Sequence, residues 1–388
     1  MIFLLKALTL GWAVIYADRT CMYPLLSIMA GSLALTSTEV GGLTSVYFFL
    51  YVAMQIPAGI LGDRFGLKKV LLFLYAIAGL GILGLGVWGT TYSSLLFFAA
   101  LHGLGAGAYY PAAYGTMLQV VEPARRGISS ATIGMGMAFG LLGGLAMSGP
   151  AYELLGSFRT PFLLMSLPTF LMLILFHYKI PCVHGSKRPS WADYRAVLMD
   201  KDLWLINAAT FTALYGFWVA LTWGPTFLKL ERGFSLGQAG LYTGLVAITA
   251  LPAALLWGKL SDHWGRKKIA MALLPLSGMS LYCLSIAESE VTIIAALLTF
   301  GLFSNSAFTP VMVAWTGDIV SKRYPDLMGA AVGIFNCIIM SSAIAAPVIS
   351  GYLRDMTGSL VPAIVAGSAV MIAGTILLYF LPANVHKT

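Results

Sequence analysis

The chain has 388 residues, of which 59% are hydrophobic and only 10% charged, with a mean hydropathy of +0.85. Such a composition excludes a water-soluble globule and indicates a protein that crosses a membrane many times. The net charge of +8 does not indicate nucleic-acid binding, because the basic residues stand in short loops between apolar runs.

Twelve apolar runs are long enough to cross a bilayer core, which needs about 20 residues per helix. They cover residues 4–32, 37–61, 68–88, 93–120, 127–149, 160–180, 202–227, 236–258, 268–287, 291–316, 328–351 and 359–382. The longest polar segment, 181–201, follows the sixth run. We therefore expect an all-α membrane protein with 12 transmembrane helices, in which residues 1–180 and 202–388 form two six-helix bundles and 181–201 is a cytoplasmic linker.

Lysine and arginine are distributed unequally between alternate loops. Of 23 such residues, 18 fall on the side that holds Lys6 and the 181–201 linker, four fall on the other side, and Arg19 lies within a helix. Cytoplasmic loops carry this excess of positive charge. The pattern predicts a multi-pass protein of the cell (inner) membrane with both termini in the cytoplasm.

The first run contains two adjacent charges, Asp18 and Arg19, about 12 residues from its cytoplasmic end. Helix rise places them roughly 18 Å deep, near the bilayer centre. A charge there costs about 3 kcal/mol or more unless it meets a partner or a wet cavity. Tyr16 and Tyr23 share the helical face of Arg19, so these residues are candidates for substrate binding. The alternative is a buried structural pair of charges with other partners.

Aromatic and amide side chains supply further candidate cavity residues. Tyr47, Tyr51 and Gln55 recur at four-residue spacing in the second run, either as a binding stripe or as core packing with satisfied hydroxyls. Amphipathic rings and amides can bind a small hydroxylated anion without further charges. The same reasoning selects Tyr110 in the fourth run, Tyr215 and Trp218 in the seventh, Asn305 in the tenth and Asn336 in the eleventh.

Glycines dominate the fifth run, at Gly134, Gly136, Gly140, Gly143 and Gly144. Small residues allow membrane helices to approach closely, so we expect this run to pack tightly on a neighbour. The sequence contains neither paired carboxylates suited to catalysis nor clustered metal ligands. We expect no enzyme activity, no metal site and no cofactor.

A basic turn between two apolar runs occurs twice. Residues 59–69 read GILGDRFGLKK, and 199 residues later 258–268 read GKLSDHWGRKK. The same shift places Thr36 and Glu39 on Ser235 and Gln238, which are both spaced as helix-starting capping boxes. One shift without gaps indicates a duplicated six-helix unit.

These turns resemble the signature loop of the major facilitator superfamily. The resemblance implies two six-helix halves around a central cavity and a cytoplasmic gate formed at the turns. By resemblance the gating residues are Asp63, Arg64 and Lys68 in the first half and Asp262, Arg266 and Asp318 in the second. The alternative is that these charges serve topology and folding alone.

The stretch Tyr16-Ala17-Asp18-Arg19-Thr20, followed by Pro24, is similar to the first helix of the anion:cation symporter branch of that superfamily. The resemblance implies that Arg19 binds the substrate anion and that Asp18 takes a proton-linked role. Relatives carry a basic residue and a glutamate in the fourth helix, where this chain has alanines. His102 lies one turn away and could replace the glutamate, or could be a hydrogen-bonded packing residue.

The sequence therefore predicts a secondary active transporter that moves a small organic anion by alternating access, with protons as partners. The alternative is a proton-linked exporter of drugs or amphipathic metabolites. Another alternative is a sensor of the same fold that binds a ligand without transporting it. A seven-helix receptor is disfavoured, because the sequence contains a duplicated six-helix unit. We expect a monomer in the lipid bilayer with no nucleic-acid partner.

Overall fold

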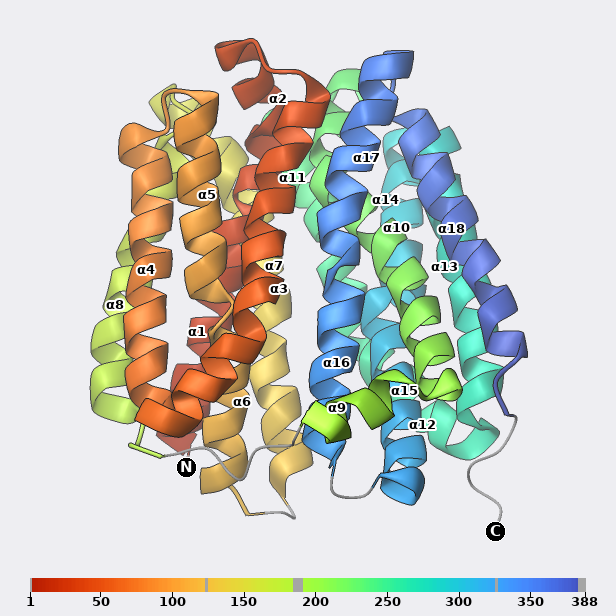
Figure 1. The fold of residues 1–388 in the computed structure, drawn as a ribbon. Coiled ribbons are helices and arrows are strands. Elements are labelled where there is room, and N and C mark those ends of the chain that lie inside the picture. Colours follow the sequence, from red (N-terminus) through yellow and green to blue (C-terminus); the bar gives the residue numbers. More distant parts are fainter. Residues whose placement is uncertain (1, 123–124, 184–190, 325–326, 383–388) are drawn as a thin grey trace. The chain divides into compact units, whose positions relative to one another are not determined.

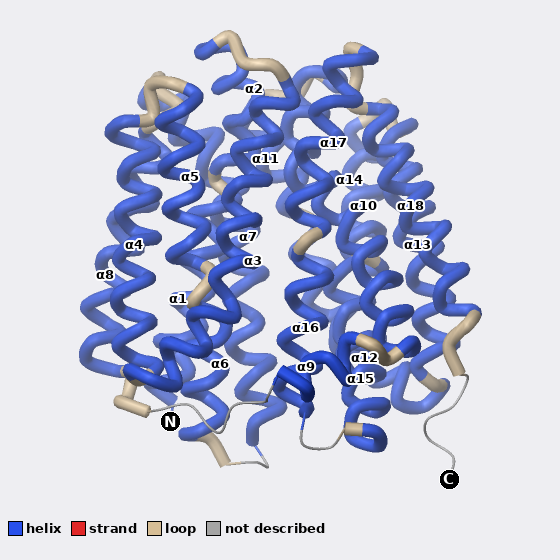
Figure 2. The backbone as a smooth tube through the Cα atoms, in the orientation of Figure 1, coloured by secondary structure: helices blue, strands red, loops and turns tan. Residues whose placement is uncertain are grey.

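The computed structural model describes residues 2–122, 125–183, 191–324 and 327–382. These residues form helices joined by short loops, without a strand among them (Figures 1 and 2). In chain order the helices are α1 (Ile2–Thr20), α2 (Met22–Leu33), α3 (Ser37–Phe65), α4 (Leu67–Trp88), α5 (Tyr92–Ala106), α6 (Tyr109–Val120), α7 (Arg126–Leu155), α8 (Thr160–Lys179), α9 (Trp191–Leu198), α10 (Lys201–Arg232), α11 (Leu236–Gly244), α12 (Val246–Trp264), α13 (Arg266–Ile286), α14 (Glu290–Phe303), α15 (Asn305–Arg323), α16 (Met328–Met340), α17 (Ser342–Thr357) and α18 (Val361–Tyr379).

The twelve predicted runs coincide with helical stretches. Ten stretches are long and apolar enough to cross a membrane by length and composition. Three of these stretches are each divided into two helices, α11 with α12, α14 with α15 and α16 with α17. The other two predicted runs, 4–32 and 93–120, are divided in the same way, into α1 with α2 and α5 with α6. The all-helical membrane fold predicted from the sequence is confirmed, and the breaks inside these five runs are features that the apolar pattern does not reveal.

Proline explains where the runs 4–32 and 93–120 are divided. Pro24 and Pro111 have no backbone N–H, so each removes the hydrogen bond to the carbonyl four residues earlier. The breaks fall at Cys21 and at Gly107, three and four residues before the prolines. The first of these interruptions lies beside a side chain that the sequence selects for the site, because α1 ends directly after Arg19.

The two halves of the sequence share local structure at the positions related by the 199-residue shift. Thr36 and Glu39 form a capping box, and Ser235 and Gln238 exchange the same pair of backbone hydrogen bonds. Gly66 and Gly265, in the two basic turns, have nearly the same backbone angles (φ 96° and ψ 135° against φ 93° and ψ 141°). The duplication therefore extends to the backbone conformation of each turn.

The chain divides into two compact units. The first, Met1–Ser186 with Gly224–Gly244, contains α1 to α8 and α11, and the second, Lys187–Trp223 with Leu245–Thr388, contains α9, α10 up to Trp223, and α12 to α18. The halves predicted with a linker over 181–201 remain a prediction. Residues 184–190 of that segment lie outside the described residues, and the segment also contains α9.

Glycines on α7 bring it close to two neighbours in the first unit. Gly136, Gly140 and Gly144 lie against the backbone of α1, where a side-chain carbon would meet carbonyl oxygens. Gly149 faces Gly237 of α11 in the same manner, which is why residues 224–244 pack with this unit. The expected close packing of the fifth run is confirmed for these glycines, whereas Gly134 and Gly143 leave room.

Candidate functional site

Two charged side chains lie in the interior of the first unit, at the end of α1. Asp18 is 1% exposed and Arg19 is 2% exposed. The Arg19 guanidinium carbon lies 3.6 Å from the ring centroid of Tyr16 and 5.1 Å from that of Phe48. Cations are attracted to the negative faces of aromatic rings, most strongly when water is excluded. The site therefore holds a buried cation against aromatic surfaces.

The aromatic stripe of α3 reaches this cation from a second direction. Tyr51 has its ring centroid 5.9 Å from the guanidinium carbon, and Tyr47 stacks on Tyr51 at 6.1 Å. Both side chains are buried, as is Gln55 one turn further on. Two glycines, Gly103 and Gly107, let the neighbouring chain approach the backbone oxygens of Tyr47 and Tyr51. The predicted stripe thus faces Arg19 and is fixed in place by close packing.

Asp18 points away from Arg19 toward α8. Thr169 donates a hydrogen bond from Oγ1 to Asp18 Oδ2 at 2.7 Å, and Cys21 donates from Sγ to the Asp18 carbonyl at 3.0 Å. Asp18 Oδ1 accepts no hydrogen bond from any described residue. The sequence reasoning missed Thr169, whose hydroxyl stands with that of Ser166 in the middle of an apolar run.

His102 of α5 lines the same small cavity as Asp18. Its Nδ1 is 3.0 Å from the carbonyl oxygen of Ala78. A carbonyl only accepts, so Nδ1 carries the hydrogen, and Nε2 of the neutral ring is left as an acceptor. Nε2 makes no hydrogen bond to a described residue. His102 is thus oriented as a group that can take up a proton.

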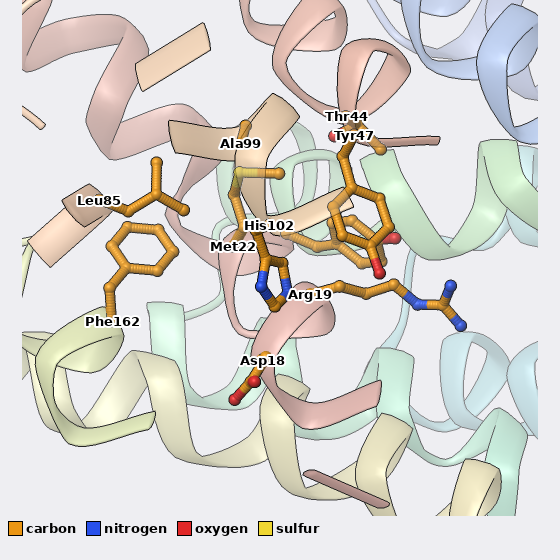
Figure 3. A pocket seen from close by; sticks show the side chains of 10 residues that line it. Asp18, Arg19, Met22, Thr44, Tyr47, Leu85, Ala99, His102 and Phe162 are labelled. Carbon is orange, nitrogen blue, oxygen red and sulfur yellow. The ribbon is translucent and has the colours of Figure 1, made fainter. Parts of the chain in front are cut away.

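The cavity between these residues measures about 10 Å³, roughly the room for one water molecule. Figure 3 shows side chains that line it, among them Asp18, Arg19, Tyr47 and His102. Tyr23 also lines it, together with Met22, Thr44, Leu85, Ala99 and Phe162. The structure thus brings Asp18, Arg19, Tyr23, Tyr47 and His102 to one buried place, although they come from four different helices.

Tyr110 of α6 belongs to an adjoining aromatic cluster. Trp12 lies 6.2 Å from Tyr110 and 5.0 Å from Tyr16, ring centroid to ring centroid. Tyr114 stacks on Tyr110 at 4.5 Å. Tyr16 therefore connects this cluster to Arg19.

The remaining predicted binding residues lie in the second unit. Tyr215 and Trp218 are buried in α10, and Asn305 is buried at the start of α15, where its Oδ1 accepts a hydrogen bond from Thr309 at 2.5 Å. Asn336 is half-buried in α16. Asn305 follows a break between α14 and α15 at Ser304. These four side chains share a unit with one another but not with Arg19.

Among the predicted gating residues, those of the second unit form an ion-pair network. Arg266 pairs with Asp262, and its Nε lies 3.3 Å from Asp318 Oδ2. Its Nη1 also donates to Ser261 Oγ at 2.6 Å. The turn at Gly265 is thereby tied to the end of α15.

The first basic turn makes different contacts. Lys68 donates from Nζ to the carbonyl oxygen of His177 at 2.6 Å, which ties α4 to α8. Arg64 lies over the ring of Phe65, with 5.2 Å between the guanidinium carbon and the ring centroid. The side chain of Asp63, the remaining predicted gating residue, is outside the described part of the structure.

A second charged cluster, missed by the sequence reasoning, joins α10 to α15. Arg323 donates to Asp200 Oδ2 at 2.8 Å and to Asp202 Oδ2 at 2.5 Å, and Tyr324 donates to Asp200 at 3.2 Å. The N–H of Leu203 donates to Asp200 Oδ1 at 3.1 Å, so Asp200 caps α10. Burial raises the pKa of the Asp200 carboxyl, but these hydrogen bonds hold it below its usual value of 3.8. The missed signal was an aspartate directly before a predicted helix.

Among the described side chains, no group of three or more His, Cys, Asp or Glu residues is arranged to bind a metal ion. The four cysteines, Cys21, Cys182, Cys283 and Cys337, are free thiols.

Comparison with known proteins gives a consistent family. The model of the Major Facilitator Superfamily matches residues 8–252 and 209–388. A probable sulfoacetate transporter of Cupriavidus necator is 26% identical over 98% of this chain and 93% of its own length. A probable galactarate/D-glucarate transporter of Bacillus subtilis is also 26% identical, over 98% of this chain and 91% of its own. A solved bacterial homolog of the human lysosomal transporter Spinster shares the fold, with a TM-score of 0.77 at 17% identity, covering 97% of this chain and 94% of that one.

Proposed function

Because this chain belongs to the Major Facilitator Superfamily and is a multi-pass membrane transporter, we propose that it carries a small organic anion across the cell membrane by alternating access. The observation that carries the proposal is Arg19, a cation that is 2% exposed near the end of α1 and enclosed by aromatic rings. The probable sulfoacetate and galactarate/D-glucarate transporters among its relatives are named for small anions, which supports an anionic substrate here.

Arg19 suits a carboxylate or sulfonate for geometric reasons. The guanidinium is planar and offers several N–H donors in a fork that matches two oxygens of one anion. The Tyr16 ring covers one face of that plane, which keeps the cation positioned while anions approach its edge. A charge-assisted hydrogen bond is also stronger in such a water-poor place than at a surface. A lysine at this position would retain the charge and lose the fork.

Proton coupling is proposed for Asp18 and His102. Both line the cavity that Arg19 also lines, and each has one polar atom directed to no described partner. An anion that binds Arg19 brings negative charge beside these groups, and a proton taken up by either of them offsets that charge. Substrate and proton would then enter the site together, as symport requires.

The other predicted residues are assigned the remaining contacts. Tyr23, Tyr47, Tyr51, Gln55 and Tyr110 are proposed to surround the substrate from the first half. Tyr215, Trp218, Asn305 and Asn336 are proposed to do so from the second. Support comes from the burial of Tyr23, Tyr47, Tyr51, Gln55, Tyr215, Trp218 and Asn305 in an apolar interior, where polar atoms require partners.

The two basic turns are proposed as the cytoplasmic gate, with Asp63, Arg64, Lys68, Asp262, Arg266 and Asp318 as its charged groups. The ion pairs of Arg266 with Asp262 and Asp318 support this assignment, because such pairs can be exchanged when helix ends move. The predicted cytoplasmic location of both termini is part of the same proposal.

Uptake by proteoliposomes tests the function. Purified protein is reconstituted, and uptake of labelled carboxylates and sulfonates is measured with and without an imposed pH gradient. Arg19→Ala should reduce uptake at least about 30-fold, since truncating the partner of a buried charge costs about 2–5 kcal/mol. Arg19→Lys should fall between this variant and the wild type. Arg354→Ala, which removes a half-buried arginine from the last turn of α17, is the matched control and should transport normally.

Two outcomes would refute the proposal. Arg19→Ala with normal uptake of the wild-type substrate would remove the anion site. Export of amphipathic cations, with none of the tested anions transported, would favour the alternative of a drug or metabolite exporter. If anion uptake does not depend on the pH gradient, the proposed substrate class stands and the proposed proton-coupling roles of Asp18 and His102 are contradicted.

A further inference from the structure

A second cavity lies on the surface of the first unit, between α4 and α8, which pack side by side (Figure 1). It measures about 530 Å³, within the range of small-ligand sites. It is lined by Leu72 and Ala76 of α4 and by Leu173, Ile174, His177 and Tyr178 of α8. None of these residues belongs to the site around Arg19.

The groove is apolar along its length and polar at one end. Ile174 is 58% exposed and Tyr178 is 76% exposed. Because both helices span the membrane, these exposed side chains face lipid. Leu72 and Ala76 stand one turn apart on α4, and His177 and Tyr178 form the end of the lining at the last turn of α8. The groove thus has the character of a binding site for a hydrocarbon chain, with a polar end that suits a lipid headgroup.

Positive charge gathers at the polar end. The Lys68 ammonium is 2.6 Å from the His177 carbonyl oxygen and stands one and two turns before Leu72 and Ala76. The distance along α4 from Lys68 to Ala76 is about 12 Å. Lys69 and Lys179 are exposed at the same helix ends. Neither α4 nor α8 contains an aspartate or a glutamate.

The distribution of lysine and arginine predicts that this end faces the cytoplasm, where the inner leaflet carries anionic lipids. Basic pockets between membrane helices on that side bind anionic headgroups, and tyrosine favours the interface between headgroups and chains. The free ammonium hydrogens of Lys68, and the exposed side chains of His177 and Tyr178, are donors for a phosphate.

We propose that the α4/α8 groove is a binding site for an anionic phospholipid. One acyl chain lies along Leu72, Ala76, Leu173 and Ile174, and the phosphate lies against Lys68, His177 and Tyr178. A lipid bound there bridges the ends of α4 and α8 beside the turn at Gly66. The site shares Lys68 with the proposed gate but takes a lipid and not the transported substrate, so it goes beyond the proposed function.

Thermal unfolding of the full chain in detergent tests the site. Phosphatidylglycerol and phosphatidylcholine with the same acyl chains are added in parallel. A ligand of the folded state stabilises it by mass action, so phosphatidylglycerol should raise the Tm of the wild type by at least about 2 °C more than phosphatidylcholine. Ala76→Trp fills the groove and should abolish this difference. Leu80→Trp, one turn further along α4 at a 52% exposed position outside the lining, should retain it.

Native mass spectrometry of the wild type keeps the proposal testable if Ala76→Trp does not fold. Copies of phosphatidylglycerol should remain bound under conditions that remove phosphatidylcholine, and Lys68→Gln should reduce their occupancy several-fold. Equal retention or equal stabilisation by the two lipids overturns the proposal. So does a full phosphatidylglycerol response in folded Ala76→Trp, or a response that inorganic phosphate reproduces alone.

Discussion

Replacing Gly140 with alanine tests whether the close contact between α7 and α1 sets the position of Arg19. Gly140 lies against the backbone of Ala13 and the side chain of Tyr16, whose ring covers the Arg19 guanidinium. A shift of α1 at this point would therefore displace the ring and the cation together. Since both are part of the proposed anion site, stability and transport should both respond.

The size of the effect follows from the space at Gly140. An added Cβ would meet the Ala13 carbonyl oxygen and lie 2.6 Å from Tyr16 Cβ, where ordinary contact begins at 3.4 Å. Subtracting 2.6 Å from 3.4 Å leaves at least 0.8 Å by which the helices must separate. Overpacking costs about 1–3 kcal/mol. Alanine returns about 0.5–1 kcal/mol of helix propensity, so a net loss of up to about 2.5 kcal/mol remains.

Two measurements check this prediction: the Tm of purified protein and the initial rate of uptake in proteoliposomes. Gly140→Ala should lower the Tm, and a displacement approaching 1 Å should reduce the uptake rate about tenfold or more. Gly143→Ala is the matched control on the same helix, because a Cβ there meets nothing within 4 Å. It should raise the Tm slightly and transport normally. Equal Tm and equal uptake in the two variants would refute the argument that this packing positions the site.

Three further predictions concern separate polar contacts. Asp200→Asn should destabilise the protein by about 1 kcal/mol at pH 7, a modest value because Arg323 is 45% exposed. Since the pKa of Asp200 lies below 3.8, the stability that its carboxylate contributes is present above that value and is lost on further acidification. The Tm difference between variant and wild type should therefore disappear below about pH 4, and a difference unchanged with pH would contradict this. Thr169→Val removes the donor to Asp18, and should cost about 1–3 kcal/mol and shift the pH profile of uptake, whereas an unaltered profile would separate Thr169 from proton coupling. Thr36→Ala breaks the capping box at the start of α3, and should lower stability by about 1 kcal/mol without slowing transport, which thermal unfolding and uptake rates will check.

Much of the fold could be predicted because it depends on local patterns. Runs of about 20 apolar residues mark membrane helices whatever their neighbours, and the capping boxes at Thr36 and Ser235 need only residues three apart. The positions at which helices are divided were harder to predict from the sequence. Proline inside a membrane helix is often tolerated when neighbouring groups satisfy the freed carbonyl, so Pro24 and Pro111 alone did not specify a break.

The site could be predicted only in part, for the same physical reason. Asp18 and Arg19 stand out because intramembrane charges are rare and costly. Their partners are chosen by packing: Thr169 lies 151 residues from Asp18, and no spacing rule connects them. Phe48 resembled any core phenylalanine until the structure placed its ring 5.1 Å from the Arg19 guanidinium carbon.

In each basic turn, the first and the last glycine have different structural requirements. Gly59 and Gly258 have open space around them and no unusual backbone angle, so an alanine would fit at either. Gly66 and Gly265 have φ near +95°, a conformation that disfavours every L-amino acid with a side chain. Protein engineers can therefore replace the leading glycine of each turn with alanine, whereas the trailing one has to remain glycine.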